Sequence, residues 1–253
     1  MSGYIAFVKK EFTENTRGYK FLIMVSVFIV LGMFSVLSAR FMPEIIAAFA
    51  PQLEITLNEP SALDAWEQFY GNVSQLGMSL MLIIFCSCLS GEYVKGTLVN
   101  MFTKGLPRPA VILSKFTVAV AIMTVSYWLC FGVTYYYTAY LWAGVALPYT
   151  VFAAFSLWLF GIMHLSILML GCVLFRQGFV SLIFYLVVQV SIGFIGMIKP
   201  LEKYSPFALT SNNLDLLSGA ASVSEFIMPI ISVLVISAGF LLTSILLFEK
   251  KQV

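Results

Sequence analysis

Charged side chains are scarce in this sequence. Only 10% of its 253 residues are Asp, Glu, Lys or Arg, against about 25% in a typical soluble protein. A soluble globule needs charge to cover its surface, whereas 60% of these residues are hydrophobic and the mean hydropathy is +0.97. The composition therefore predicts a protein whose solvent is largely lipid. The net charge of +2 gives no indication of nucleic-acid binding.

Groups that perform catalysis or bind metals are also rare. The sequence has one histidine, His164, inside an apolar run, and no such run contains a carboxylate to act with it. A metalloprotease needs several ligands and a base, and a serine nucleophile needs a base within reach. Residues 91–97 have two glycines at the spacing of a phosphate-binding loop, but Thr97 stands where that loop needs lysine. We therefore expect no enzyme, no metal site and no cofactor on this chain.

Cysteine usage agrees with that expectation. The four cysteines all fall inside apolar runs, where ordinary buried thiols are more common than disulfides or zinc ligands. They are Cys86, Cys88, Cys130 and Cys172.

Six apolar runs without a single charged residue can be read along the chain. Each is long enough, or nearly so, to cross about 30 Å of hydrocarbon at about 1.5 Å per helical residue. The runs cover residues 21–39, 73–89, 116–142, 149–175, 179–198 and 226–248. The first run exceeds the apolar core of a signal peptide, so we expect it to remain as a span. The fold class predicted is an all-α integral membrane protein with six transmembrane helices.

The basic residues are distributed unevenly between the two sides of these spans. Of the 14 Lys and Arg residues, 11 lie on the side of the termini, and the other three are Arg40, Lys199 and Lys203. Because cytoplasmic loops carry the excess of Lys and Arg, this asymmetry predicts that both termini are cytoplasmic.

Residues 1–20 are predicted to form an amphipathic helix at the membrane surface. One side is apolar, and the opposite side carries Lys9, Lys10, Glu11, Thr13, Glu14, Arg17 and Lys20. Two interpretations stay open. The helix is a plain surface anchor, or it is an interfacial elbow whose Lys10, Glu14 and Arg17 also touch a cytoplasmic partner.

The segment 91–108 between the second and third spans is more patterned than a plain loop. Leu98, Met101 and Phe102 recur at helical spacing, so we expect a short amphipathic helix that ends before the glycine and prolines at 105–109. Glu92 lies one helical turn from Lys95. Either the two form a solvated pair, or Glu92 holds this segment against a partner or against the N-terminal helix.

Other features suggest a path for a transported molecule. Within the spans, His164 and Gln189 are polar points that either satisfy helix–helix contacts or face a cargo. After the fifth span, Pro200 and Pro206 forbid one continuous helix, and the leucines that follow suit a short helix at the membrane mouth. The tyrosines between residues 135 and 149 are typical of an interfacial aromatic belt, with a ring-lined cargo surface as the alternative.

The second-to-third-span segment resembles that of the ABC-2 type permeases, the membrane subunits of bacterial ABC exporters. The resemblance rests on Glu92, Gly96-Thr97, Arg108 and Lys115, and on Ser205-Pro206-Phe207 after the fifth span. It covers the whole chain as one domain, residues 1–253, with an interfacial N-terminal helix, six spans and cytoplasmic termini. The family often has a proline three residues before the Arg, where this chain has Gly105.

This resemblance implies an ATP-binding subunit as a separate partner, present in two copies and holding ATP and Mg²⁺. In such exporters segment 91–108 is a coupling helix that sits in a groove of the ATPase. The coupling residues would be Glu92, Lys95, Gly96, Thr97, Leu98, Met101, Phe102 and Arg108. A second permease copy, identical or a sister protein, would complete the exporter in the bacterial cell membrane.

A cargo class also follows from the lack of charge in the spans. A highly charged solute would meet no compensating group there, so we expect an amphipathic or hydrophobic cargo. Membrane-active peptides are the first choice, as exported by similar small permeases, and lipid-like molecules are the second. Two alternatives remain: a polysaccharide-exporting relative, and a non-transport membrane protein such as a sensor partner or immunity factor.

Overall fold

The computed structural model describes residues 2–49, 59–103, 105, 107–145 and 147–251, of which residues 2, 45–49, 94–95 and 99–101 are described by backbone alone. Over these ranges the fold is all-helical, and no strand is present. Six helical segments are long and apolar enough to span a membrane. The predicted fold class is therefore confirmed.

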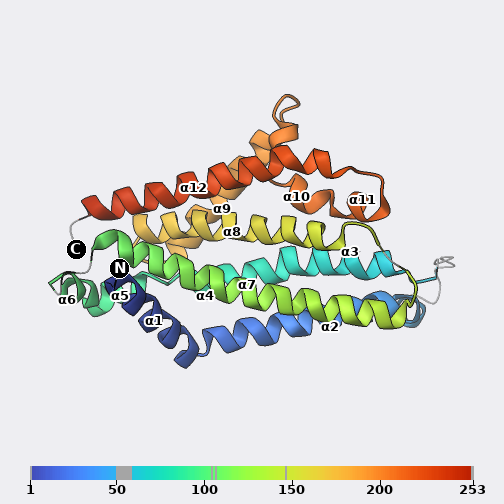
Figure 1. Cartoon of the computed structure of the whole chain (residues 1–253), viewed down its shortest axis with the longest axis horizontal. Coiled ribbons are helices and arrows are strands. Elements are labelled where there is room, and N and C mark those ends of the chain that lie inside the picture. The colour runs from blue at the N-terminus through green and yellow to red at the C-terminus, as the bar shows by residue number, and fades with distance from the viewer. Residues whose placement is uncertain (1, 50–58, 104, 106, 146, 252–253) are drawn as a thin grey trace.

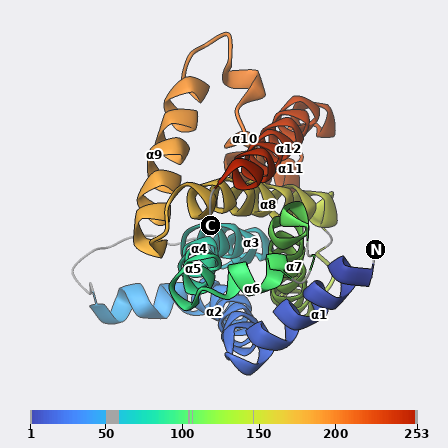
Figure 2. The ribbon, with the colours of Figure 1, turned by 90° about the vertical axis from the view of Figure 1, so that its left-hand side faces the viewer.

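The spans form an elongated bundle with α8 at its centre (Figures 1 and 2). In α8, 83% of the most apolar window is buried inside the protein, against 11% in α9 and 17% in α12. The last two helices therefore present most of their apolar surface outward. The six spans are α2 (Lys20–Phe49), α3 with η1 and α4 (Ala62–Asn72, Val73–Gly77, Met78–Phe85), α7 (Arg108–Leu141), α8 (Thr150–Leu174), α9 (Gly178–Gly196) and α12 (Ile227–Lys250).

Several helices extend beyond the apolar runs that predicted them. The second span begins at Ala62 rather than near residue 73, because Ser61 and Asp64 form a capping box. The Asp64 carboxylate accepts a hydrogen bond from the Ser61 backbone N–H at 2.8 Å, and the Asp64 N–H donates to the Ser61 hydroxyl at 3.3 Å. Similarly, α2 continues through Pro43. Hydropathy thus locates the lipid-facing part of a helix but not its ends.

A π-helical turn, η1, interrupts the second span. Buried residues recur every fourth position from Ala65 to Phe85 on this span, with Phe69, Val73, Gly77 and Met81 between them. An α-helix turns once every 3.6 residues, so a four-residue spacing would rotate away from the bundle by about 40° per repeat. The wider π turn takes up one extra residue and so offsets about 100° of this rotation, which helps to keep the stripe facing inward.

Both described ends of the chain lie at the same end of the bundle, which we call the terminal face (Figure 1). It also holds three short helices: α1 (Ser2–Arg17), which was predicted from the sequence, and α5 (Ser90–Lys95) and α6 (Thr97–Thr103). Gly96 separates α5 from α6 with φ of +62°, a conformation that favours glycine. The segment 91–108 is thus two short helices at an angle, where one was predicted.

The opposite face is closed by a segment folded back between α9 and α12. Its elements are η2 (Glu202–Tyr204), α10 (Ala208–Ser211), α11 (Asn213–Ser218) and η3 (Val223–Phe226). Leu209, Leu216 and Leu217 are fully buried, as α10 packs on α8 and α11 packs on α3. A Cβ at Gly196 would lie 2.5 Å from the Ser205 hydroxyl oxygen, so any larger residue there would force the Ser205 side chain to move.

Candidate functional site

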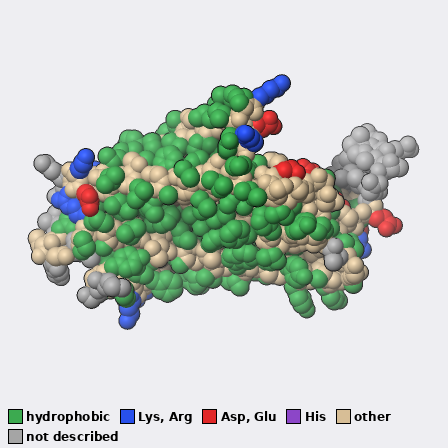
Figure 3. Space-filling model, turned by 45° about the horizontal axis from the view of Figure 1, so that its top comes forward, with side chains coloured by type: hydrophobic (Ala, Val, Ile, Leu, Met, Phe, Trp, Pro, Cys, Tyr) green, Lys and Arg blue, Asp and Glu red, His purple; other side chains and the backbone are tan. Residues whose placement is uncertain are grey.

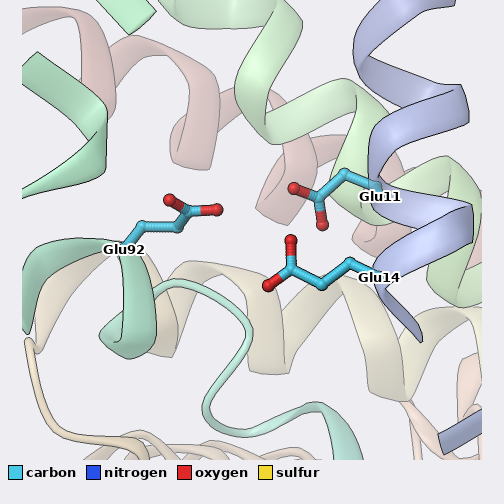
Figure 4. A group of neighbouring side chains, drawn as sticks. All are labelled: Glu11, Glu14 and Glu92. Carbon is cyan, nitrogen blue, oxygen red and sulfur yellow. The ribbon is translucent and has the colours of Figure 1, made fainter. Parts of the chain in front are cut away.

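Five charged residues from three helices meet at the terminal face, and we call them the charge cluster: Lys10, Glu11 and Glu14 of α1, Glu92 of α5 and Lys115 of α7. Figure 4 shows its three carboxylates, with Glu92 facing Glu11 and Glu14 across a cleft. That cleft has a volume of about 630 Å³. Only 4–6% of the surface of Glu11, Glu92 and Lys115 is exposed.

The two lysines bridge the carboxylates. The Lys115 Nζ atom lies 2.9 Å from Glu11 Oε1 and 3.3 Å from Glu92 Oε1. The Lys10 Nζ atom lies 2.8 Å from the same Glu92 oxygen and 3.3 Å from Glu14 Oε2. The Thr97 hydroxyl donates to the second Glu92 oxygen. Glu92 therefore joins α5 to α1, α6 and α7 at once.

Burial makes this cluster sensitive to the loss of any one member. Desolvating two opposite charges costs about as much as their attraction returns, so a buried ion pair adds little net stability. Removing one partner is different, because it leaves an uncompensated buried charge and costs about 3–5 kcal/mol. The cluster thus fixes one relative position of α1, α5 and α7.

The state of Lys10 follows from its neighbours. Burial opposes its charge, but the hydrogen bond to Glu92 and the negative charges of Glu11, Glu92 and Glu14 outweigh burial and raise the pKa of Lys10 above its usual 10.5. Lys10 is therefore a cation at neutral pH.

Oxygen atoms of Glu11, Glu14 and Glu92 lie within 4.8 Å of one another, a spacing that a metal ion could occupy. Two lysine ammonium groups already lie among these oxygens, at 2.8 to 3.4 Å. The protein's own cations thus supply most of the counter-charge. The arrangement is that of an ion-pair network rather than of a metal site.

The structure brings together some of the predicted coupling residues. Glu92 and Thr97 lie in or beside the charge cluster, and Leu98 is fully buried. Glu92 is not a solvated residue, and the side chains of Lys95 and Met101 lie outside those described. Of the three predicted elbow residues, Lys10 is in the cluster, Glu14 is at its exposed edge and Arg17 is exposed.

Arg108 contacts the end of another helix, and its predicted role in coupling stays a prediction. Its guanidinium donates to the carbonyl oxygens of Glu249 and Lys251 at 2.6 and 2.7 Å and lies over the Phe102 ring, 5.3 Å from its centroid. Lys251 in turn donates to the Val173 carbonyl at 2.6 Å. The start of α7 and the ends of α8 and α12 are therefore joined through helix-end carbonyls. Cations are stabilising at helix C-termini, where the last carbonyl groups lack partners within the helix.

Two members of the cluster were not predicted as site residues. The sequence predicts Glu11 on the polar side of the surface helix, yet it is the most buried charged residue among those described. Lys115 was known only as part of a family pattern. Its position in the sequence could have indicated a site residue, because a lysine at the start of an apolar run must pair with an acidic group or reach water.

The two residues predicted for a cargo path lie in neighbouring spans, His164 in α8 and Gln189 in α9. His164 is 5% exposed, with its Nδ1 atom 2.8 Å from the Phe160 carbonyl oxygen and its ring centroid 5.5 Å from that of Tyr185. Gln189 follows Tyr185 by one turn, and its side-chain oxygen is buried without a hydrogen-bond partner among the described residues. A role for either residue in a cargo path stays a prediction.

Comparison with known proteins shows a distant similarity to a membrane protein. The chain is 23% identical over 184 residues to the uncharacterized transmembrane protein YxlG of Bacillus subtilis (strain 168), and the similarity covers 70% of each sequence. No family model matches the chain. Together with the six spans, this similarity identifies a multi-pass membrane protein.

Proposed function

We propose that this protein is the permease subunit of an ATP-driven exporter of the ABC-2 type. The observation that carries the proposal is the charge cluster, in which Glu92 ties the short helices α5 and α6 to α1 and α7. A permease without an ATP-binding site of its own must receive force from a partner through a rigid surface element. A pair of short helices held by buried charges to a span is suited to that task.

In this proposal the terminal face is cytoplasmic and receives the ATPase. The basic residues favour that orientation, since 11 of the 14 Lys and Arg residues belong to segments on the side of the termini. Two ATP-binding subunits would bind ATP and Mg²⁺, and a second permease copy would pair with this one. Movement of α5 and α6 would then displace α1 and α7 as one body, because the charge cluster joins them.

The proposed cargo is amphipathic or hydrophobic, with membrane-active peptides favoured and lipid-like molecules second. The support is chemical: among the described spans, charged side chains occur only near the helix ends. An unpaired charge near the bilayer centre costs about 2.5–3.5 kcal/mol on insertion scales. Cargo therefore needs an apolar part to pass.

The test is reconstitution of the chain with the ATP-binding subunit that co-purifies with it. We expect ATP hydrolysis that depends on this chain and is stimulated by amphipathic peptides. Glu92→Gln should reduce transport per ATP hydrolysed, while Glu249→Gln, an exposed change at the same face, should not.

Two results would refute the proposal in different ways. If no ATPase co-purifies under mild extraction, the protein belongs with the non-transport alternatives. If glycans alone stimulate hydrolysis and peptides and lipids do not, the exporter assignment stands but the cargo class is wrong.

A further inference from the structure

An apolar slot lies between α9 and α12, near the opposite face. It has a volume of about 350 Å³, and its walls are mainly aliphatic. They include Ile192, Ile195, Leu201, Ile231, Val235 and Ile236. Ile195 and Val235 are 53% and 65% exposed, so the slot opens onto the surface that faces lipid. A volume of this size with mainly hydrophobic walls is typical of sites that bind small apolar molecules.

A charged pocket adjoins the slot. It has a volume of about 790 Å³ and is lined by Lys199, Glu202, Lys203 and Glu225, among others. Gly196 and Ser205 line both spaces, so the two lie side by side. Basic and acidic side chains stand beside one another on the projection at the top of Figure 3, above an otherwise hydrophobic surface.

These four charges are not matched to one another. Within the described residues none of them forms an ion pair. Glu225 is the most constrained, since its carboxylate accepts hydrogen bonds from the Ser222 backbone and hydroxyl. The Lys203 ammonium lies 4.9 Å from the centroid of the Tyr204 ring. Lys199 and Glu202 are exposed. The pocket thus offers two cations and two anions to a ligand.

We propose that the slot and the pocket together bind one zwitterionic phospholipid from the adjacent leaflet. An acyl chain occupies the slot, Lys199 and Lys203 face the phosphate, and Glu202 faces the ammonium group. A peptide fits the slot poorly, because its backbone N–H and C=O groups would lack partners among aliphatic walls. This inference does not rest on the proposed transport function, since it concerns binding alone.

Lipid binding to the purified full-length chain tests the inference. Native mass spectrometry in detergent would compare four probes: dioleoyl phosphatidylethanolamine, dioleoyl phosphatidylglycerol, dioleoylglycerol and glycerophosphoethanolamine. We expect retention of phosphatidylethanolamine to exceed that of each other probe, because only this probe supplies a chain and both charges. Free glycerophosphoethanolamine distinguishes headgroup binding alone from binding of the whole lipid.

Variants test the two parts separately. Val235→Trp fills the slot from its lipid-facing side and should weaken binding at least about tenfold, because excluding even two CH2 groups of the chain accounts for about that factor. Leu234→Trp, one position along α12 and outside the slot, is the matched control. The double change Lys199→Gln with Lys203→Gln should weaken phosphatidylethanolamine binding by about 25-fold, as each surface lysine contributes roughly a factor of five.

Three outcomes overturn the inference. One is equal binding by Val235→Trp and Leu234→Trp. Another is equal or stronger retention of phosphatidylglycerol or dioleoylglycerol by the original sequence. The third is a change from dimer to monomer in Val235→Trp with lipid binding unaltered, because a second copy of the chain would then cover the slot.

Discussion

Replacing Lys115 by methionine should destabilise the protein more than any other single change in the charge cluster. Methionine keeps the length of the side chain but removes the cation that lies 2.9 Å from Glu11 and 3.3 Å from Glu92. Two carboxylates then remain buried, with only Lys10 to compensate them. Since Lys10 is itself half-buried and already paired with Glu92, Glu11 loses its best partner.

The size of the effect can be bounded. At 2.9 Å and an effective dielectric constant near 20, one pair attracts by about 6 kcal/mol before desolvation is subtracted. Removing one partner of a buried pair costs about 3–5 kcal/mol in measured cases. For a domain of this size each kcal/mol lowers the melting temperature by about 2–4 °C, so Lys115→Met should lower it by roughly 6–20 °C.

A double-mutant cycle isolates the pair. Glu11→Gln should cost less than Lys115→Met, because Lys115 keeps Glu92 as a partner. The double variant should be more stable than the sum of the two losses predicts, by at least about 1 kcal/mol, since it buries no unpaired charge at position 11. Melting of each variant in the same detergent, followed by tryptophan fluorescence, is the measurement. Strict additivity, or an unchanged melting temperature for Lys115→Met, would refute the assignment of a buried network.

Four further results are expected. Single cysteines introduced at Lys104 and Lys250 should react with an impermeant maleimide only after permeabilisation, and one at Glu59 should react in intact cells; labelling of position 104 from outside would reverse the proposed orientation. Gly32→Ala should lower the stability by about 1–3 kcal/mol, since its Cβ would lie 2.8 Å from the Cys130 carbonyl oxygen. The control Gly132→Ala has open space around it and should not lower the stability. Equal melting temperatures for the two variants would disprove the close approach of α2 to α7. Arg108→Leu should speed proteolysis at the C-terminal end of α12, because the carbonyls of Glu249 and Lys251 lose their hydrogen-bond donor. An unchanged cleavage rate would contradict a stabilising role for these hydrogen bonds. Because the pKa of Lys10 is raised in the folded state, its contribution to stability is complete below about pH 10.5 and is lost as the pH rises through the higher folded-state pKa. A Lys10→Met variant should therefore lose less stability than the original protein in that alkaline range. Identical losses would argue against the pairing of Lys10 with its carboxylates.

The spans could be predicted from the sequence because the bilayer imposes a single requirement on each of them. A helix of apolar residues is almost the only way to cross hydrocarbon, so composition decides the outcome without knowledge of neighbours. The ends of the helices could not be predicted in this way. The start of α3 depends on the capping box of Ser61 and Asp64, which lies in water-facing sequence that hydropathy does not detect.

The candidate site was only partly predictable for a related reason. The resemblance drew attention to Glu92, but nothing local to α1 indicates that Glu11 turns inward rather than toward solvent. Its burial is set by Lys115, 104 residues further along the chain. Helical periodicity predicts which side of a helix is polar. It does not predict that this polar side contacts a buried lysine of another helix.

The π turn at Val73–Gly77 has a consequence for how this protein compares with its relatives. An α-helix that acquires one residue without losing its pairing on either side accommodates it as a π bulge. Removing one residue from this window should therefore restore a regular α-helix while leaving Trp66 and Phe85 facing the bundle as before. Single-residue length differences among homologues are thus expected within residues 73–77. They should be rare in the uninterrupted α8, where a one-residue deletion would rotate the most buried span by about 100°.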